Sequence, residues 1–473
     1  MSRLLWTRVY STRTPAFFTM SAHSASSAFI ITANSFAWLR QGRFVVKIDP
    51  LRLDGRTKGL PAGLAPTSRA NIAEAGWNVL AEALPLPLAL LKESSLRHNA
   101  EWMSAFRRMT GVAIAPHGKT TMSPELYARQ LGDGAWGITV ATVQQLRVCR
   151  EQGIQRVLLA NQLVGKQAIR YVLDELERDP TFEFCCLVDS VAGVEILDRA
   201  KREKGGKRSL DVLLECGAMG ARTGCRTLDD ALLVARRVAS ARPRLRLIGV
   251  EGFEGAIHGA SPEDVEARIT AFVDFIGHVA ERCAGENLID ADPILLSAGG
   301  SAYFDIATRL PRAFNGRAAL VIIRSGCYLT HDSDGYAKAA TQMRARMPAL
   351  AALGAGLRDA LEVWSYVQSL PEPGLAILTM GKRDVSYDQK LPFPRIVFRP
   401  GVDLAPRALP PECMISALND QHAFLRTPEA SGLAVGDMIG CTISHPCTTF
   451  DKWRFMPVVD DAYNVVDAIT TWF

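Results

Sequence analysis

The 473-residue sequence has no CxxC pair, no uninterrupted apolar run long enough to cross a bilayer, and no GxGxxG motif after its first expected strand. Its ten cysteines occur singly, apart from Cys185 and Cys186. This scatter indicates reduced thiols that serve mostly as small core residues. The missing GxGxxG motif disfavours a dinucleotide-binding open sheet.

Acidic residues are missing from positions 1–48, which contain six basic residues. These six account for the net charge of +5, because the remainder of the chain has 48 basic and 49 acidic residues. A nucleic-acid partner is therefore not expected.

Residues 14–39 carry no Lys, Arg, Asp or Glu, but Ser, Thr, Asn and His interrupt them throughout, so no membrane helix is expected. The Ser-, Thr- and Arg-rich composition is typical of a transit peptide, and it also arises when a start codon is placed too early. We expect residues 1–45 to be a disordered extension or a mis-assigned start, and the protein to be cytoplasmic.

Short apolar runs alternate with amphipathic segments about nine times, which predicts an α/β fold with parallel strands. The apolar runs are residues 87–91, 112–115, 136–140, 157–160, 182–188, 212–214, 245–250, 294–296 and 319–323. Helices are expected at 143–151, 166–177, 228–239 and 262–282. The number of units favours a (β/α)₈ barrel over residues 81–335, with an open doubly wound sheet as the competing fold.

Strand-like pieces punctuated by prolines replace this alternation after residue 335. They predict a separate β domain over residues 336–473. Residues 46–80 are too few to fold alone and are expected to pack on this C-terminal domain.

One lysine stands where a barrel places its active site. The apolar run 112–115 ends in a polar turn that contains His117 and Lys119, and the carboxyl ends of barrel strands form the catalytic rim. A desolvated lysine there can attack an aldehyde and form a Schiff base. Taken alone, the turn fits an ordinary exposed lysine better.

The segment PHGKTTMSPELYARQLGDGAWGITVATVQQL, followed by RVLLANQLVG, resembles the alanine-racemase-like (fold-type III) pyridoxal-phosphate enzymes. The resemblance is to their D-serine dehydratase and D-threonine aldolase branch. It implies that Lys119 binds pyridoxal 5′-phosphate and that His117 contacts it. Aldolase members usually carry a further histidine where this chain has Thr121, so that histidine's role is not carried over.

Three further elements resemble cofactor-binding parts of this family. In LLECGAMGARTG, Arg222 matches the arginine near the cofactor's phenolic oxygen, although Cys216 replaces a common acid and one residue is inserted. The other two elements are loops after late strands, a common phosphate site in barrels. They supply the expected cofactor contacts Gly299, Gly300, Ser301, Arg324, Gly326, Cys327 and Tyr328.

A candidate metal pair lies near the C-terminus. His445 and Cys447 follow an apolar run at 438–443, and in an extended segment both side chains point to one face. Imidazole and thiolate suit Zn²⁺, although a lone HxC is more often a buried structural pair. The resemblance implies that this pair binds a divalent metal, in the form typical of the dehydratases.

His422 resembles a histidine that precedes the family's metal pair, with Gln421 in place of the usual acid. It is a candidate neighbour of the metal. The remaining histidines form no spaced cluster and are expected to be structural: His23, His98, His258, His278 and His331.

The resemblance implies a homodimeric lyase that dehydrates a 3-hydroxy-D-amino acid such as D-serine to a keto acid and ammonia. Zinc would bind the β-hydroxyl and assist its departure, and the cofactor would take up the charge left at Cα. Retro-aldol cleavage to glycine and an aldehyde is the alternative reaction. A non-catalytic pyridoxal-phosphate barrel and a plain binding module are the alternatives of other classes.

Overall fold

The structure is a computed structural model, and it describes residues 53–473. The predictions for residues 1–45, the start of the 46–80 segment and His23 lie outside the described residues.

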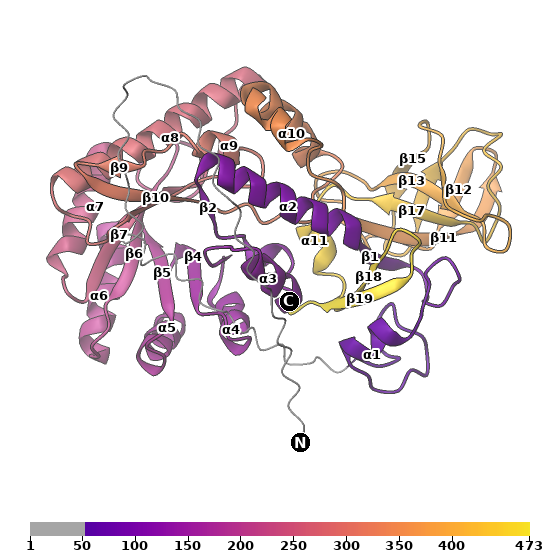
Figure 1. The fold of residues 1–473 in the computed structure, drawn as a ribbon, viewed down its shortest axis with the longest axis horizontal. Coiled ribbons are helices and arrows are strands. Elements are labelled where there is room, and N and C mark those ends of the chain that lie inside the picture. Colours follow the sequence, from indigo (N-terminus) through magenta and orange to yellow (C-terminus); the bar gives the residue numbers. More distant parts are fainter. Residues whose placement is uncertain (1–52) are drawn as a thin grey trace, which may run out of the picture. The chain divides into compact units, whose positions relative to one another are not determined.

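Eight parallel strands form a barrel (Figure 1). They are β2 (Ala113–Ile114), β3 (Ile138–Val140), β4 (Arg156–Gln162), β5 (Glu183–Val188), β6 (Leu210–Cys216), β7 (Leu245–Gly252), β8 (Ile294–Ser297) and β10 (Arg317–Ile323). The ring closes between β2 and β3, where Trp136 N donates to the Ile114 carbonyl at 2.7 Å and Thr139 N donates to that of Pro116 at 2.9 Å. The predicted (β/α)₈ fold class is confirmed.

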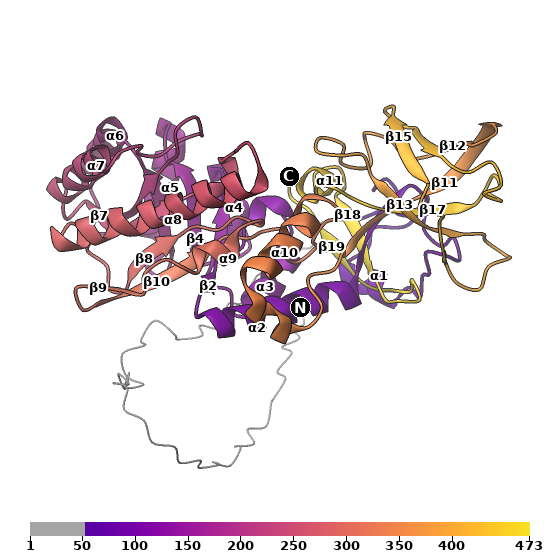
Figure 2. The same cartoon turned by 90° about the horizontal axis from the view of Figure 1, so that it is seen from above.

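Helices surround the barrel strands (Figure 2). They are α2 (Glu93–Thr110), α3 (Pro124–Gly132), α4 (Val143–Glu151), α5 (Lys166–Arg178), α6 (Val191–Lys204), α7 (Leu228–Ser240), α8 (Pro262–Gly285) and the short, fully buried α9 (Phe304–Ala307). Side chains at their N-caps fix where several of them begin; Thr142, for example, accepts from Gln145 N at the start of α4. The four helices predicted from the sequence are confirmed to within three residues at their ends.

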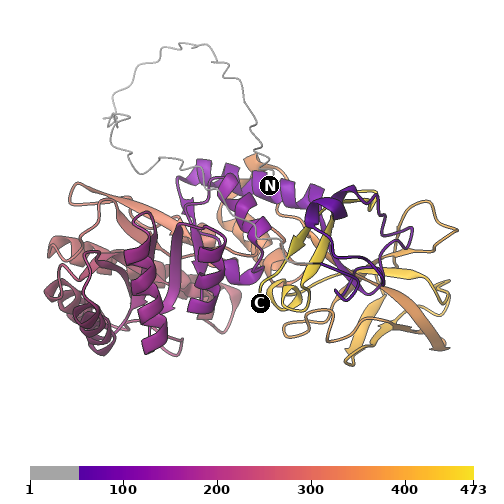
Figure 3. The ribbon, with the colours of Figure 1, turned by 90° about the horizontal axis from the view of Figure 1, so that it is seen from below.

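The C-terminal domain is a mainly antiparallel sheet that follows α10 (Gly335–Arg346). Its strands are β11 (Leu361–Glu372), β12 (Leu375–Leu378), β13 (Phe393–Phe398), β14 (Arg407–Ala408), β15 (Met414–Leu418), β16 (Ala423–Arg426), β17 (Met438–Thr442), β18 (Phe455–Val459) and β19 (Val465–Thr470). Residues near the start of the described chain contact this sheet, since α1 (Arg69–Glu74) packs on β19 (Figure 3).

One predicted barrel strand was wrong. The apolar run 87–91 forms β1 (Leu88–Lys92), which pairs with β11 and β18 in the C-terminal sheet rather than with any barrel strand. Every residue of β1 is buried. A short run that is apolar on both faces fits the centre of either sheet, so only its pairing partners decide its domain.

Asn99 joins α2 to the segment between the barrel and the C-terminal sheet. This fully buried amide donates to the carbonyl oxygens of Leu329 at 2.9 Å and Arg358 at 2.7 Å, and it accepts from Arg358 N at 2.7 Å. One side chain therefore satisfies three backbone groups that have little access to water.

No helix within residues 53–473 combines the length and the apolarity needed to cross a membrane.

We expect Asn99→Ala to lower the free energy of unfolding by about 2 to 4 kcal/mol, because it leaves buried backbone groups without partners. Urea unfolding followed by circular dichroism measures the change. Glu101→Ala, an exposed site on the same helix, is the matched control and should change stability by at most about 0.5 kcal/mol. Equal effects of the two variants would contradict this account of the junction.

Candidate active site

Lys119 lies in a single 3₁₀ turn (Gly118–Thr120) that follows β2 at the carboxyl end of the barrel strands. Tyr127 of α3 holds this turn, because its hydroxyl donates to the Gly118 carbonyl at 2.7 Å. Thr120 is buried, whereas Lys119 is exposed. The lysine amine is therefore presented to solvent at the rim on a turn that the protein interior anchors.

His117 stands two residues before Lys119, and its Nδ1 atom is buried without a hydrogen-bond partner among the described residues. Burial lowers the pKa of His117 well below its usual value, and the positive charges of Lys119 and Arg324 lower it further. The imidazole is therefore neutral at physiological pH and has an unused nitrogen.

Arg324 extends from the end of β10 and forms a buried ion pair with Glu251 of β7. It also donates to the Gly252 carbonyl at 3.1 Å. Burial raises the pKa of Glu251 to about 7, although the arginine opposes the rise. Glu251 Oε1 has no hydrogen-bond partner among the described residues.

The two predicted phosphate loops, at Gly299–Ser301 and after β10, are neighbours. The amides of the first loop bind the carboxylate of Glu254, which the sequence analysis did not identify. Glu254 accepts from Gly299 N at 2.9 Å and from Gly300 N at 2.6 Å. Ser301 Oγ accepts from Cys327 N at 3.2 Å, which joins the two loops. No local signal marks Glu254, since it precedes the glycines by some 45 residues.

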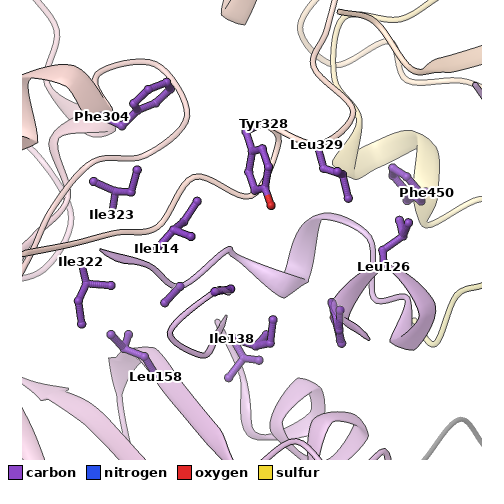
Figure 4. Close-up of a cluster of buried hydrophobic side chains, with 14 of the residues drawn as sticks. Ile114, Leu126, Ile138, Leu158, Phe304, Ile322, Ile323, Tyr328, Leu329 and Phe450 are labelled. Carbon is purple, nitrogen blue, oxygen red and sulfur yellow. The ribbon is translucent and has the colours of Figure 1, made fainter. Parts of the chain in front are cut away.

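A glycine lets the β10 loop lie directly on the Lys119 turn. A Cβ atom at Gly326 would come within 2.5 Å of Thr120 Oγ1 and 2.6 Å of the His117 carbonyl oxygen. Nearby, Tyr328 is part of a buried apolar cluster with Ile114 and Leu126 (Figure 4). Its hydroxyl forms a hydrogen bond with the side chain of Gln130, and its ring packs in the core.

Arg222 lies on the exposed loop after β6, and its guanidinium stands 4.5 Å from the centre of the Phe253 ring. The loop is tied to the barrel by Thr223, which donates to Glu215 at 2.7 Å. Cys216 is fully buried in β6.

The predicted metal pair is present, but not in the extended geometry. Pro446 has a helical backbone, and the short helix α11 (Cys447–Phe450) begins directly after it. The expectation of an extended segment is therefore wrong, because the proline turns the chain. His445 Nδ1 lies 2.5 Å from Asp388 Oδ2, which orients the ring and leaves Nε2 as the available donor atom.

Cys447 carries its thiol to the Lys119 turn. Its sulfur lies 3.6 Å from Thr120 Oγ1 and 3.8 Å from the sulfur of Cys327. The hydrogen bond from Cys327 lowers the pKa of Cys447 to about 7, with smaller contributions from Thr120 and Lys119 and with burial opposing. The thiolate form is therefore more accessible in Cys447 than in an ordinary cysteine.

His422 is exposed in the turn between β15 and β16. Within residues 53–473, no three side chains of His, Cys, Asp or Glu form a ready metal-binding group. His422 therefore does not complete such a group with His445 and Cys447.

The rim residues fit a phosphate-bearing aldehyde cofactor. The exposed amine of Lys119 can bind the aldehyde. The cations Arg222 and Arg324 lie close enough to lower the pKa of His117. The Nδ1 atom of His117, which has no partner among the described residues, can form a hydrogen bond with a further polar group. His445, oriented by a carboxylate, and the acidic thiol Cys447 are suitable metal donors.

Two family models match the chain. The model for the alanine racemase N-terminal domain matches residues 91–301, and the "Putative serine dehydratase domain" matches residues 360–459.

Three characterised proteins are similar to the chain. A D-threonine aldolase from an Arthrobacter species is 25% identical over 79% of this chain and 89% of its own length. A 3-hydroxy-D-aspartate aldolase from Paracoccus denitrificans is 27% identical over 65% of the chain and 74% of its own length. A D-threo-3-hydroxyaspartate dehydratase from a Delftia species is 28% identical over 39% of the chain and 47% of its own length.

Solved structures share the fold. The D-threonine aldolase of Filomicrobium marinum superposes with a TM-score of 0.68 at 22% identity, covering 84% of this chain and 97% of that one. A metal-free D-threo-3-hydroxyaspartate dehydratase with one cysteine replaced by alanine superposes with a TM-score of 0.64 at 19% identity, covering 84% and 99%.

In metal-depleted protein, we expect iodoacetamide to modify Cys447 before the other nine cysteines, which are buried. The rate should rise with pH around a midpoint near 7, because the thiolate is the nucleophile and its pKa is lowered to about 7. Peptide mass spectrometry measures each site, and urea-unfolded protein, with ordinary thiol pKa values near 8.5, is the control. Faster labelling of another cysteine would contradict the assigned geometry.

Proposed function

Because the chain belongs to the fold-type III pyridoxal-phosphate enzymes, with an alanine racemase N-terminal domain and a serine dehydratase domain, we propose that it is a metal-dependent lyase. Its substrate is a 3-hydroxy-D-amino acid, and its reaction is dehydration followed by deamination to a keto acid and ammonia. D-Serine would give pyruvate by this route.

One contact carries the proposal. Cys447 of the C-terminal domain reaches Thr120, the residue next to Lys119, with 3.6 Å between sulfur and hydroxyl oxygen. The candidate metal donor of one domain thus contacts the residue next to the candidate cofactor lysine of the other. An enzyme that must act at Cα and Cβ of one small substrate requires these two kinds of group at adjacent positions.

Lys119, His117, Arg222 and Arg324 would hold pyridoxal phosphate, which supplies an electron sink for negative charge developing at the substrate Cα. The exposed amine of Lys119 can accept the Cα proton when it is not bound to the cofactor. His117, neutral because of its burial and its cationic neighbours, adds no further positive charge. The Arg324–Glu251 pair keeps the guanidinium at a defined place in a buried setting.

His445 and Cys447 would hold the metal, which supplies Lewis acidity toward the β-hydroxyl of the substrate. Asp388 fixes the tautomer of His445 by accepting from Nδ1. A thiolate and an imidazole favour zinc over magnesium or manganese.

Retro-aldol cleavage of the same substrates is the second candidate. The two aldolases match a larger share of the chain than the dehydratase does. The cysteine at position 447 supports dehydration, because the resemblance associates a His-x-Cys pair with the dehydratases. The reaction is decided by which bond to Cβ breaks, and product analysis separates the two.

We expect Lys119→Ala to lose the absorbance of lysine-bound cofactor and to lower turnover by at least about a thousandfold, because it removes both the attachment point and the base. Lys207→Ala, an exposed lysine before β6 at the opposite end of the strand, is the matched control and should keep both. Near-normal activity of Lys119→Ala would overturn the assignment of the site.

The reaction is tested by incubating the cofactor-loaded enzyme with D-serine, D-threonine and 3-hydroxyaspartate, with and without chelator. We expect ammonia and a keto acid, and we expect the chelator or Cys447→Ala to abolish their formation. Glycine and an aldehyde would identify an aldolase instead. Absence of turnover with bound cofactor would identify a non-catalytic pyridoxal-phosphate protein.

A further inference from the structure

Two thiols from different domains meet at the rim. Cys327 follows β10 of the barrel, and Cys447 begins α11 of the C-terminal domain. Their sulfur atoms are 3.8 Å apart. Thr120 Oγ1 lies beside both sulfurs, 3.8 Å from Cys327 Sγ and 3.6 Å from Cys447 Sγ.

We infer that Cys327 is a further metal ligand, which binds the same ion as Cys447 so that one sulfur comes from each domain. The inference rests on the metal of the proposed function. Zinc–sulfur bonds of about 2.3 Å in tetrahedral geometry place two ligand sulfurs about 3.8 Å apart. The two thiols already have this separation, so a shared ion requires no displacement of one sulfur relative to the other.

The surroundings of the sulfurs fit this assignment. Cys327 is 3% exposed, and its sulfur is hydrogen-bonded to the Tyr336 hydroxyl as well as near Thr120. Hydroxyls next to ligand sulfurs can orient them without competing strongly for a soft ion. Lys119 lies close enough to lower the pKa of Cys447. Its positive charge would therefore offset part of the negative charge of two thiolates.

The backbone and the side chain of Cys327 would then have different roles. The backbone N–H of Cys327 donates to Ser301 and joins the two predicted phosphate loops, while its side chain faces Cys447. Both thiols release their protons to solvent when the ion binds. The two sulfurs would occupy two positions of a four-coordinate ion and leave two for a further donor and the substrate.

The test counts sulfur ligands in zinc-loaded protein by X-ray absorption at the zinc edge. Wild-type protein should show two sulfurs near 2.3 Å, and Cys327→Ser should show one. In cobalt-loaded protein, the near-ultraviolet thiolate charge-transfer band should fall by about half in Cys327→Ser. Cys413→Ser removes another buried thiol and should keep the full band, and circular dichroism checks that each variant is folded.

A single sulfur in both wild type and Cys327→Ser would overturn the inference while leaving the proposed function intact. A Cys327–Cys447 disulfide, identified by peptide mass spectrometry of the unfolded, non-reduced protein, would overturn it as well. Absence of bound zinc in wild type would contradict the metal role in both proposals. The absorbance of Lys119-bound cofactor would still report separately on the cofactor site.

Discussion

The close approach of the β10 loop to the turn after β2 is the constraint on which the site depends. Gly326 lies so near Thr120 and the His117 carbonyl that a Cβ atom would collide with both. The absence of this side chain allows Arg324, Cys327 and the Lys119 turn to share one small region. The C-terminal domain then reaches that region through Cys447, so the same contact brings a candidate metal donor next to the lysine turn.

The charged groups at the rim include the buried ion pair of Arg324 with Glu251 and the exposed side chain of Lys119. Arg324 and Glu251 are paired in the interior, and breaking such a pair would leave an uncompensated buried charge. Glu254 accepts hydrogen bonds from the amides of Gly299 and Gly300, and its negative charge also helps to raise the pKa of Arg324. A phosphate that used these amides would have to displace the carboxylate, whereas Lys119 is exposed.

Much of the barrel could be predicted because its strands and helices have local periodicity. The run 143–151 ends where α4 ends, and the polar turn at Lys119 follows a buried strand as expected. β1 could not be assigned to its sheet, because a five-residue run buried on both faces has no pattern that distinguishes one sheet from another. Pro446 changed the geometry of the HxC pair, since its helical backbone starts α11 instead of continuing a strand.

The fold class, the place of Lys119 after a buried strand and the spacing of His445 and Cys447 could be predicted, because they depend on short-range pattern and residue type. Which groups meet at the rim could not be predicted in this way, because it depends on long-range contacts. Glu254 bonds to glycines some 45 residues away, and Cys327 lies against Cys447 across 120 residues. Such contacts depend on closure of the barrel ring and on docking of the C-terminal domain, and no local spacing encodes either one.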